Sequence, residues 1–420
     1  MSSGHRQDIN QLVDHLFRQE SGKMIAVLSR LLGLQNLDTA QDIVQDTLIQ
    51  AMSSWGYNGI PDNPSGWLSR VARNKAIDLL RRQQRFKTIS PQYAHLLQSE
   101  SPLSETLSQL FLETEIQDSQ LRMMFACCHP AIPPESQIAL TLKTLCGLSA
   151  SEIAQAFLTS EETIAKRIYR AREKIRTEKI ELEVPLGPAL PVRLDAVLKC
   201  LYLLFNEGYH SSHPEQLIRE DLCREAMRLC LLVTEHPLTN YPRARALLSL
   251  FCFQSSRLPA RLDDDGHIIL LKYQDRSKWY APLIQKGFDY LDAAAEPFEE
   301  STYPIEAAIA SLHAAAPSFD RTDWKSIYNL YELLYRLQPN PIVAMNKAIA
   351  AAYTFNTQEA LRELLRIEGL ERHHLYHAAI GEMYLDMHDH ARAKTHFETA
   401  LGLTRSASVR QLLQQKINGC

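Results

Sequence analysis

The stretch "LSASEIAQAFLTSEETIAKRIYRAREKI" (148–175) carries two apolar patterns separated by a short break. In its second half, apolar residues recur at the spacing of one helix face: Ile164, Ile168, Ala171 and Ile175. In the first half, Ile153, Ala154 and Phe157 predict a shorter helix whose apolar face packs across the second. Two short helices joined by a tight turn form a helix-turn-helix.

The sequence also predicts where these helices begin and which residues lie on their polar faces. Ser149 or Ser151 can cap the first helix and Ser160 the second, because a serine oxygen accepts from the free backbone N–H groups there. Basic residues lie off the apolar face: Lys166, Arg167, Arg170, Arg172, Lys174 and Arg176. Such a face favours DNA phosphates, with side chains near the helix start reaching base edges. A solvated basic helix is the alternative. Leu158 stands where the turn often has Gly.

A second basic amphipathic helix is predicted upstream, in "NPSGWLSRVARNKAIDLLRRQQRFK" (63–87). Its apolar positions are Trp67, Leu68, Val71, Ala72, Ile77 and Leu80. Asp78 is its one acid, and Asn74 lies midway along it. Such a helix suits single-stranded DNA, because its cations can contact successive phosphates while its aromatic and amide groups contact exposed bases. A surface helix with long, partly buried basic side chains is the alternative.

The segment 38–55 predicts a helix with a core face at Val44, Leu48 and Ala51. Its other face presents an acidic and amide patch of three residues: Asp42, Gln45 and Asp46. This patch would either dock a basic partner protein or be solvated, and periodicity does not choose between the two.

Composition sets the general class. The chain has 420 residues, 45% of them hydrophobic, and a net charge of -4, so its basic segments are local. No signal peptide or membrane span is predicted, which indicates a cytoplasmic protein. Eight cysteines without a CxxC pair favour buried thiols over a metal site, "CCHP" (127–130) included. Scarce strand-type alternation predicts an all-α fold, with one β-like excursion at "LDDDGHIILLKY" (262–273).

Proline-containing and polar breaks divide the chain. We predict helical modules at 8–87 and 108–180, a linker at 88–107, and a C-terminal helical region at 184–420. Within that region, tetratricopeptide-like (TPR-like) helix pairs are predicted near 325–404. Five positions fit the repeat pattern: Gly381, Tyr384, Ala393, Phe397 and Ala400. A shortened relative precedes it, with Tyr353 and Ala360.

Three motifs in order, "DIVQDT" (42–47), "GWLSRVARNKAIDLLRR" (66–82) and "EIAQAFLTSEETIAKRIYRAREKI" (152–175), resemble regions 2 and 4 of extracytoplasmic-function (ECF) sigma factors. Further segments resemble the ECF group with a long C-terminal extension ending in TPR-like repeats, among them "LYLLFNEGYHSS" (201–212), "RLDDDGHIILL" (261–271) and "QDRSKW" (274–279). The resemblance implies an alternative sigma factor that brings core RNA polymerase to particular promoters and performs no catalysis itself.

The resemblance also implies site residues. Contacts to the melted −10 element would come from Trp67, Arg70, Arg73, Asn74, Lys75, Asp78, Arg81 and Arg82. Contacts to the −35 element would come from Ser160, Thr163, Lys166, Arg167, Tyr169, Arg170 and Arg172. The polymerase β′ coiled coil would bind Asp42, Val44, Gln45 and Asp46, and the β flap would bind region 4. Ala165 replaces a basic residue of some relatives, so the −35 sequence does not transfer.

The extension allows several interpretations. In "FNEGYHSSHPE" (205–215), helix capping and a hydrogen-bond network are favoured over an acid/base pair or metal ligands. The acidic run 263–265 lacks the EF-hand spacing, which favours a turn or a docking surface over a calcium loop. We expect no cofactor or metal, and we expect the extension to contact and control the sigma modules in cis. The competing hypothesis is a helix-turn-helix regulator with a TPR sensor that does not replace sigma.

Overall fold

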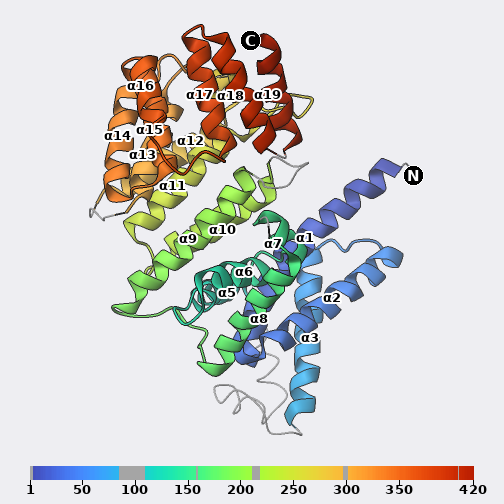
Figure 1. Ribbon diagram of the computed structural model, residues 1–420. Coiled ribbons are helices and arrows are strands. Elements are labelled where there is room, and N and C mark those ends of the chain that lie inside the picture. Colours follow the sequence, from blue (N-terminus) through green and yellow to red (C-terminus); the bar gives the residue numbers. More distant parts are fainter. Residues whose placement is uncertain (1–2, 85–108, 158, 211–217, 297–300, 405) are drawn as a thin grey trace. The chain divides into compact units, whose positions relative to one another are not determined.

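A computed structural model describes residues 3–84, 109–157, 159–210, 218–296, 301–404 and 406–420 (Figure 1). Helices make up the regular structure of these residues, and one isolated antiparallel bridge joins Leu262 to Ile268. The predicted all-α fold is confirmed, including its one β-like excursion. The chain forms two compact units, Met1–Leu204 and Phe205–Cys420.

The first module of the N-terminal unit consists of α1 (Ser3–Leu32), the short 3-10 helix η1 (Leu34–Asn36), α2 (Leu37–Asn58) and α3 (Pro64–Gln84). On α3, fully buried residues recur every fourth position: Leu68, Ala72, Ala76 and Leu80. Phe17, Trp55 and Trp67 form an aromatic cluster, with ring centroids 5.4 and 5.5 Å apart. The apolar face predicted for 63–87 therefore packs inside a three-helix module.

The second module consists of α5 (Glu113–Cys127), α6 (Pro134–Thr144), α7 (Ala150–Ala156) and α8 (Glu161–Thr177). The four residues predicted to form one face of α8 are all buried. Ser149 Oγ accepts from the Glu152 N–H at 3.1 Å, and the Glu152 carboxylate accepts from the Ser149 N–H at 2.7 Å, forming a capping box. Ser160 Oγ caps α8 by accepting from the Thr163 N–H at 3.2 Å. The predicted helix-turn-helix is confirmed, and Leu158 lies outside the described residues.

Helix α9 (Ala189–Tyr209) begins shortly after the boundary expected at 180–184. It begins inside the proline-rich segment 183–194 that predicted a helix break, because Pro191 occupies the first turn, where no helical N–H partner is lost. The units divide at Leu204 and Phe205, so the first three turns or more of α9 belong to the N-terminal unit. There the buried Arg193 guanidinium donates to the Phe125 carbonyl at the end of α5, at 2.6 Å.

The C-terminal unit continues with α10 (Glu220–Glu235), α11 (Pro242–Ser256) and α12 (Ala281–Ala293), with 3-10 turns at Leu258–Ala260, Leu271–Tyr273 and Arg276–Lys278. Arginines cap helix ends in this region. Arg261 donates to the Tyr209 carbonyl at the end of α9, with its guanidinium 3.8 Å from the Tyr209 ring centroid. Arg276 donates to the His313 carbonyl near the end of α13 (Tyr303–Ala315). The donor to Tyr209 thus comes from outside the 205–215 segment, and capping by the segment's own polar side chains stays a prediction.

The chain ends in a series of helix pairs: α13 (Tyr303–Ala315), α14 (Trp324–Leu337), α15 (Pro341–Thr354), α16 (Thr357–Leu364), α17 (His374–Asp386), α18 (His390–Leu403) and α19 (Ala407–Gly419). Consecutive helices pack on one another (Figure 1). A Cβ added to Gly381 would lie 2.6 Å from the Phe397 ring, so the glycine permits the close approach of α17 and α18. Tyr384, Ala393, Phe397 and Ala400 are buried, which confirms the predicted TPR-like pair.

One residue of the earlier pair was placed wrongly. Tyr353 is 42% exposed and stacks on Trp324, with ring centroids 4.4 Å apart. The buried positions of this pair are instead Ala348, Ala351, Ala360 and Leu364. The alanines at 348 and 351 allow α15 and α16 to pack closely. They occupy the core positions of the pair, and Tyr353 lies outside the core.

Seven cysteines are buried, and the eighth, Cys420, is partly exposed. Burial raises the pKa of Cys127 to about 12, and its Sγ lies 3.4 Å from Thr144 Oγ1. The predicted buried thiols are thus confirmed. Within the described ranges, no helix combines the length and apolar character needed to cross a membrane.

Candidate nucleic-acid interface

The exposed face of α8 carries most of the residues predicted to read double-stranded DNA. Lys166, Tyr169 and Arg170 are exposed at positions i, i+3 and i+4, so their side chains share one face. Tyr169 is 60% exposed, which is unusual for so large a ring. Lys166 forms an ion pair with Glu162 at 2.7 Å. At the helix start, Ser160 and Thr163 are committed to the cap, with their hydroxyl oxygens 2.8 Å apart.

Two of the predicted α8 contacts are placed differently. Arg167 is half-buried. Arg172 forms an ion pair with Asp38 of α2 at 2.6 Å and donates to Gln41 of the same helix. The sequence predicts Arg172 as a contact to the −35 element. Its partners in the structure lie more than a hundred residues away in the chain, where no helical periodicity could reveal them.

The predicted single-strand face on α3 begins at a well-defined helix start. Asn63 Oδ1 accepts from the Gly66 N–H at 2.9 Å, and Pro64 occupies the first helical position, where its fixed φ is favourable. Asn74 is exposed midway along the helix. The cations are distributed around it: Arg70, Arg81 and Arg82 are exposed, and Arg73 and Lys75 are half-buried. Asp78 lies 3.9 Å from Arg81, a weak surface ion pair.

A hollow of about 380 Å³ adjoins the start of this face. The first module contributes Asn63, Ser65, Gly66, Ser69, Arg70 and Arg73, together with Glu20 and Lys23 of α1. Phe111, Glu113 and Ile116, from the start of the second module, line its other side. Two of the predicted −10 residues, Arg70 and Arg73, therefore border a cavity that both modules line.

On α2, Asp42, Gln45 and Asp46 are exposed and form one acidic and amide surface. Val44 is 2% exposed, so its side chain packs inside the module and is not part of that surface. The sequence had assigned Val44 to the core face by periodicity, and its burial agrees with that assignment.

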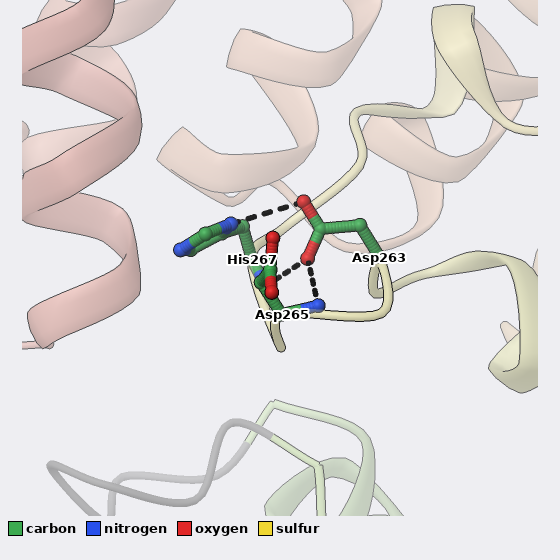
Figure 2. A group of neighbouring side chains, drawn as sticks. All are labelled: Asp263, Asp265 and His267. Atoms are coloured by element: carbon green, nitrogen blue, oxygen red, sulfur yellow. Dashed lines mark hydrogen bonds and ion pairs between the residues drawn. The ribbon is translucent and has the colours of Figure 1, made fainter.

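The acidic segment of the extension is a turn (Figure 2). Asp263 Oδ1 accepts from the backbone N–H groups of His267 and Asp265 at 2.7 and 3.0 Å, and the His267 ring lies 3.0 Å from Oδ2. These bonds, led by the one from the His267 backbone, hold the pKa of Asp263 below its usual range. Gly266 has a φ of +81°, which glycine adopts without strain. The Asp263 carboxylate therefore stabilises a turn through these hydrogen bonds, and a turn is one of the two structures that the sequence favours here.

Comparisons with known proteins assign both modules. Residues 16–86 match the Sigma-70 region 2 family, and residues 122–175 match Sigma-70, region 4. An uncharacterised protein of Rhizobium meliloti is 36% identical over 91% of this chain and 90% of its own length. The chain belongs to the ECF sigma factors with a long C-terminal extension.

Other relatives cover a smaller share of this chain. The ECF RNA polymerase sigma factor SigE of Mycolicibacterium smegmatis is 29% identical over 39% of this sigma factor and 60% of its own length. The ECF RNA polymerase sigma-E factor of Haemophilus influenzae is 27% identical over 42% of this chain and 90% of its own length. Residues 193–295 match a family of unknown function, DUF6596. A structure of yeast Tom70 aligns over 92% of this chain and 81% of its own, with a TM-score of 0.37 and 13% identity, too low to bear on the fold.

Proposed function

We propose that this sigma factor binds core RNA polymerase and directs transcription from particular promoters, in the cytoplasm. The supporting observation is that one chain carries sigma regions 2 and 4 in order, each folded as a helical module. Two of the relatives named above, from Mycolicibacterium smegmatis and Haemophilus influenzae, are ECF RNA polymerase sigma factors. The protein contributes binding and positioning, while the polymerase performs the chemistry.

Region 2 would engage the −10 element through α3. The exposed Asn74 amide can hydrogen-bond a base that has left the stack, and the surrounding cations attract the phosphates of the melted strand. Unstacking a base costs a few kcal/mol, and contacts made only to the flipped base offset that cost. The α2 surface of Asp42, Gln45 and Asp46 would bind the β′ coiled coil of the polymerase.

Region 4 would read the −35 element through α8. The exposed Lys166, Tyr169 and Arg170 lie between the second turn and the middle of α8, the second helix of the motif, which enters the major groove in helix-turn-helix proteins. An arginine can bind guanine with two hydrogen bonds, which is worth about 1–3 kcal/mol of discrimination. Arg167 would contact phosphate, and the module would rest on the β flap of the polymerase.

We further propose that the C-terminal extension controls the sigma modules in cis. Helix α9 supports this, because its first turns pack in the N-terminal unit while its end is capped in the C-terminal unit. A rearrangement of the extension that shifts α9 would reach Arg193 and the end of α5 directly. A separate membrane-bound regulator would not be needed.

Transcription in vitro tests the proposal. Purified core polymerase without another sigma is given fragments of the source genome, and the transcripts are sequenced. We expect initiation at a defined promoter set that depends on the chain. Asn74→Ala and Arg170→Ala should lower that initiation about tenfold or more, since each removes a contact of about 1–3 kcal/mol.

Matched controls separate these effects from loss of fold or bulk charge. Gln50→Ala removes an exposed amide of α2, and Arg176→Ala removes an exposed arginine from the last turn of α8. Both should retain most activity. Folded protein without affinity for core polymerase would contradict the proposal and leave the helix-turn-helix regulator as the explanation.

A further inference from the structure

A second hollow, of about 590 Å³, lies in the C-terminal unit, between two segments that have no part in the proposed promoter contacts. One wall is the segment 272–277, which leads into the 3-10 turn Arg276–Lys278. The other wall is the segment 317–320, in the connection between α13 and α14. A hollow of this volume is typical of pockets for small organic ligands.

Arg276 connects the two walls. Its Nη1 donates to the carbonyls of His313 and Ala316, at and just after the end of α13. In its own turn, Asp275 Oδ1 accepts from the Ser277 N–H and hydroxyl at 2.9 and 2.7 Å, so that carboxylate is already used. The protein itself holds both walls in place, so a ligand would not have to order them on binding.

The positive charge of Arg276 pairs with no carboxylate in the described part of the chain, since its acceptors are main-chain carbonyls. A second guanidinium, that of Arg257, donates to the side-chain oxygens of Gln274 and Gln254, each at 3.4 Å. The Cζ atoms of Arg276 and Arg257 lie 4.2 and 5.2 Å from the centroid of the Trp279 ring. Two cations around one ring, with neutral acceptors, create a positive potential that attracts an anion.

Three buried polar atoms around Arg276 have no hydrogen-bond partner within the residues that the structure describes. They are Arg276 Nη2, Trp279 Nε1 and His313 Nδ1. Native proteins leave few buried polar groups unsatisfied, so three around one arginine need an explanation. Arg276 is half-buried and lines the hollow, so a small movement of its side chain would bring Nη2 to an acceptor that enters there.

Aromatic rings provide an apolar surface in the same hollow. Phe319 lines it, and the Phe319 ring centroid lies 5.0 Å from that of Trp324 and 5.2 Å from that of Tyr353. On the opposite wall, Tyr273 is 66% exposed. Rings on both walls favour a planar group, which buries area against them. Asp320 also lines the hollow and is exposed, so it disfavours a second negative charge on the ligand.

We propose that this hollow binds a small aromatic carboxylate, with its carboxylate on Arg276 and its ring between Tyr273 and Phe319. A guanidinium suits a carboxylate because its N–H groups match the two oxygens. One negative charge offsets the excess positive charge of Arg257 and Arg276, while a doubly charged phosphate would be repelled by Asp320. This site is separate from the proposed promoter contacts, so its occupancy can be measured on the free chain whether or not the chain directs transcription.

Saturation-transfer NMR and calorimetry on the full chain test the site with probes of similar shape. Phenylacetate carries an aromatic ring and a carboxylate, and phenylacetamide replaces the carboxylate with a neutral amide. We expect phenylacetate to bind at millimolar concentration or below. Phenylacetamide should bind about tenfold more weakly, because it loses the charge-assisted hydrogen bond to Arg276.

Phenyl phosphate tests the choice of anion, and it should bind more weakly than phenylacetate. Three results would each overturn the inference: no binding of phenylacetate at millimolar concentration, equal binding of the acid and the amide, or tighter binding of phenyl phosphate.

Variants of the full chain locate the binding. Arg276→Gln should weaken phenylacetate about tenfold, because it removes the cation. Lys278→Gln is the matched control, since it removes an exposed cation of the same 3-10 turn that lies outside the lining, and it should bind as the parent does.

Because Arg276 also connects the walls, a second variant leaves it in place. Ser318→Trp fills the hollow with a large side chain and should abolish the binding of phenylacetate. Circular dichroism and the thermal midpoint establish that each variant is folded. Phenylacetate that binds the parent and all folded variants alike would lie elsewhere on the chain, and the proposed site would be wrong.

Discussion

At the scale of single residues, Gly381 decides how closely the last repeat packs. A Cβ there would meet three atoms of the Phe397 ring at 2.6–3.0 Å. The ring is fully buried and cannot move aside. Gly381→Ala should therefore lower the free energy of unfolding by about 1–3 kcal/mol, the usual effect of overpacking a core.

The matched control is Gly402→Ala, in α18 of the same pair, where an added Cβ meets nothing within 4 Å. This change should raise stability by about 0.5–1 kcal/mol, because alanine loses less backbone entropy in a helix than glycine does. Urea unfolding of both variants, followed by hydrogen exchange in α17 and α18, measures the difference. Equal effects of the two substitutions would contradict the packing role of Gly381.

His313 makes the extension sensitive to acid. Burial, followed by the charges of Arg257 and Arg276, lowers its pKa from 6.5 to about 3. Below pH 6.5 the unfolded chain binds a proton that the folded chain does not, so stability is complete above that pH and falls as pH decreases toward 3. His313→Gln should lessen the loss between pH 7.5 and 5.5 by about 1 kcal/mol. Hydrogen exchange of α13 at the two pH values measures it, and an unchanged slope would show that His313 does not titrate in this way.

Residue roles could be read from the sequence where they depend on periodicity. The buried face of α8, the Ser160 cap and the exposed Asn74 follow from local spacing alone. The prediction for Tyr353 was wrong because this tyrosine lies two residues from Ala351, the buried position of the helix pair, and its residue type matches the repeat pattern. Arg172 was placed incompletely because Asp38 and Gln41 come from a different module, and a partner so distant in the chain leaves no periodic signal.

At the scale of helices, the approach of α1 to the end of α6 is set by Gly22. Gly22→Ala would force the Leu145 carbonyl away from α1, and we expect faster hydrogen exchange at residues 145–148 and in the facing turn of α1. Gly56→Ala, in α2 with nothing within 4 Å, is the matched control and should leave that exchange unchanged.

Helix boundaries were predictable to within a few residues wherever caps and apolar faces coincide, as at α3, α7 and α8. They were less predictable at α9. Prolines suggested a break through residue 194, yet a proline in the first turn is compatible with a helix, and only packing against α5 decides where the helix starts. Burial of Arg193 on the Phe125 carbonyl is that packing, and it lies outside any local pattern.

At the scale of the whole molecule, the contacts of α9 bear on where the chain can be divided. A fragment that ends at residue 182, where the sequence places the boundary, lacks Arg193 and Cys200. It would leave the Phe125 carbonyl without its donor, and the Cys128 thiol without the Cys200 sulfur that lies 3.6 Å away. The fragment 1–204 keeps both contacts, so its core remains covered.

We therefore expect the fragment 1–204 to unfold cooperatively, with a midpoint at least several degrees above that of 1–182. An unsatisfied buried carbonyl and lost apolar burial together cost a few kcal/mol, and about 1 kcal/mol shifts a domain of this size by 2–4 °C. Thermal unfolding followed by circular dichroism measures the two midpoints. Arg193→Met in the 1–204 fragment is the control that isolates the hydrogen bond, and it should lower the midpoint by part of the difference between the two fragments. Identical midpoints would show that α9 does not support the sigma modules, and would remove the structural link through which the extension is proposed to act on them.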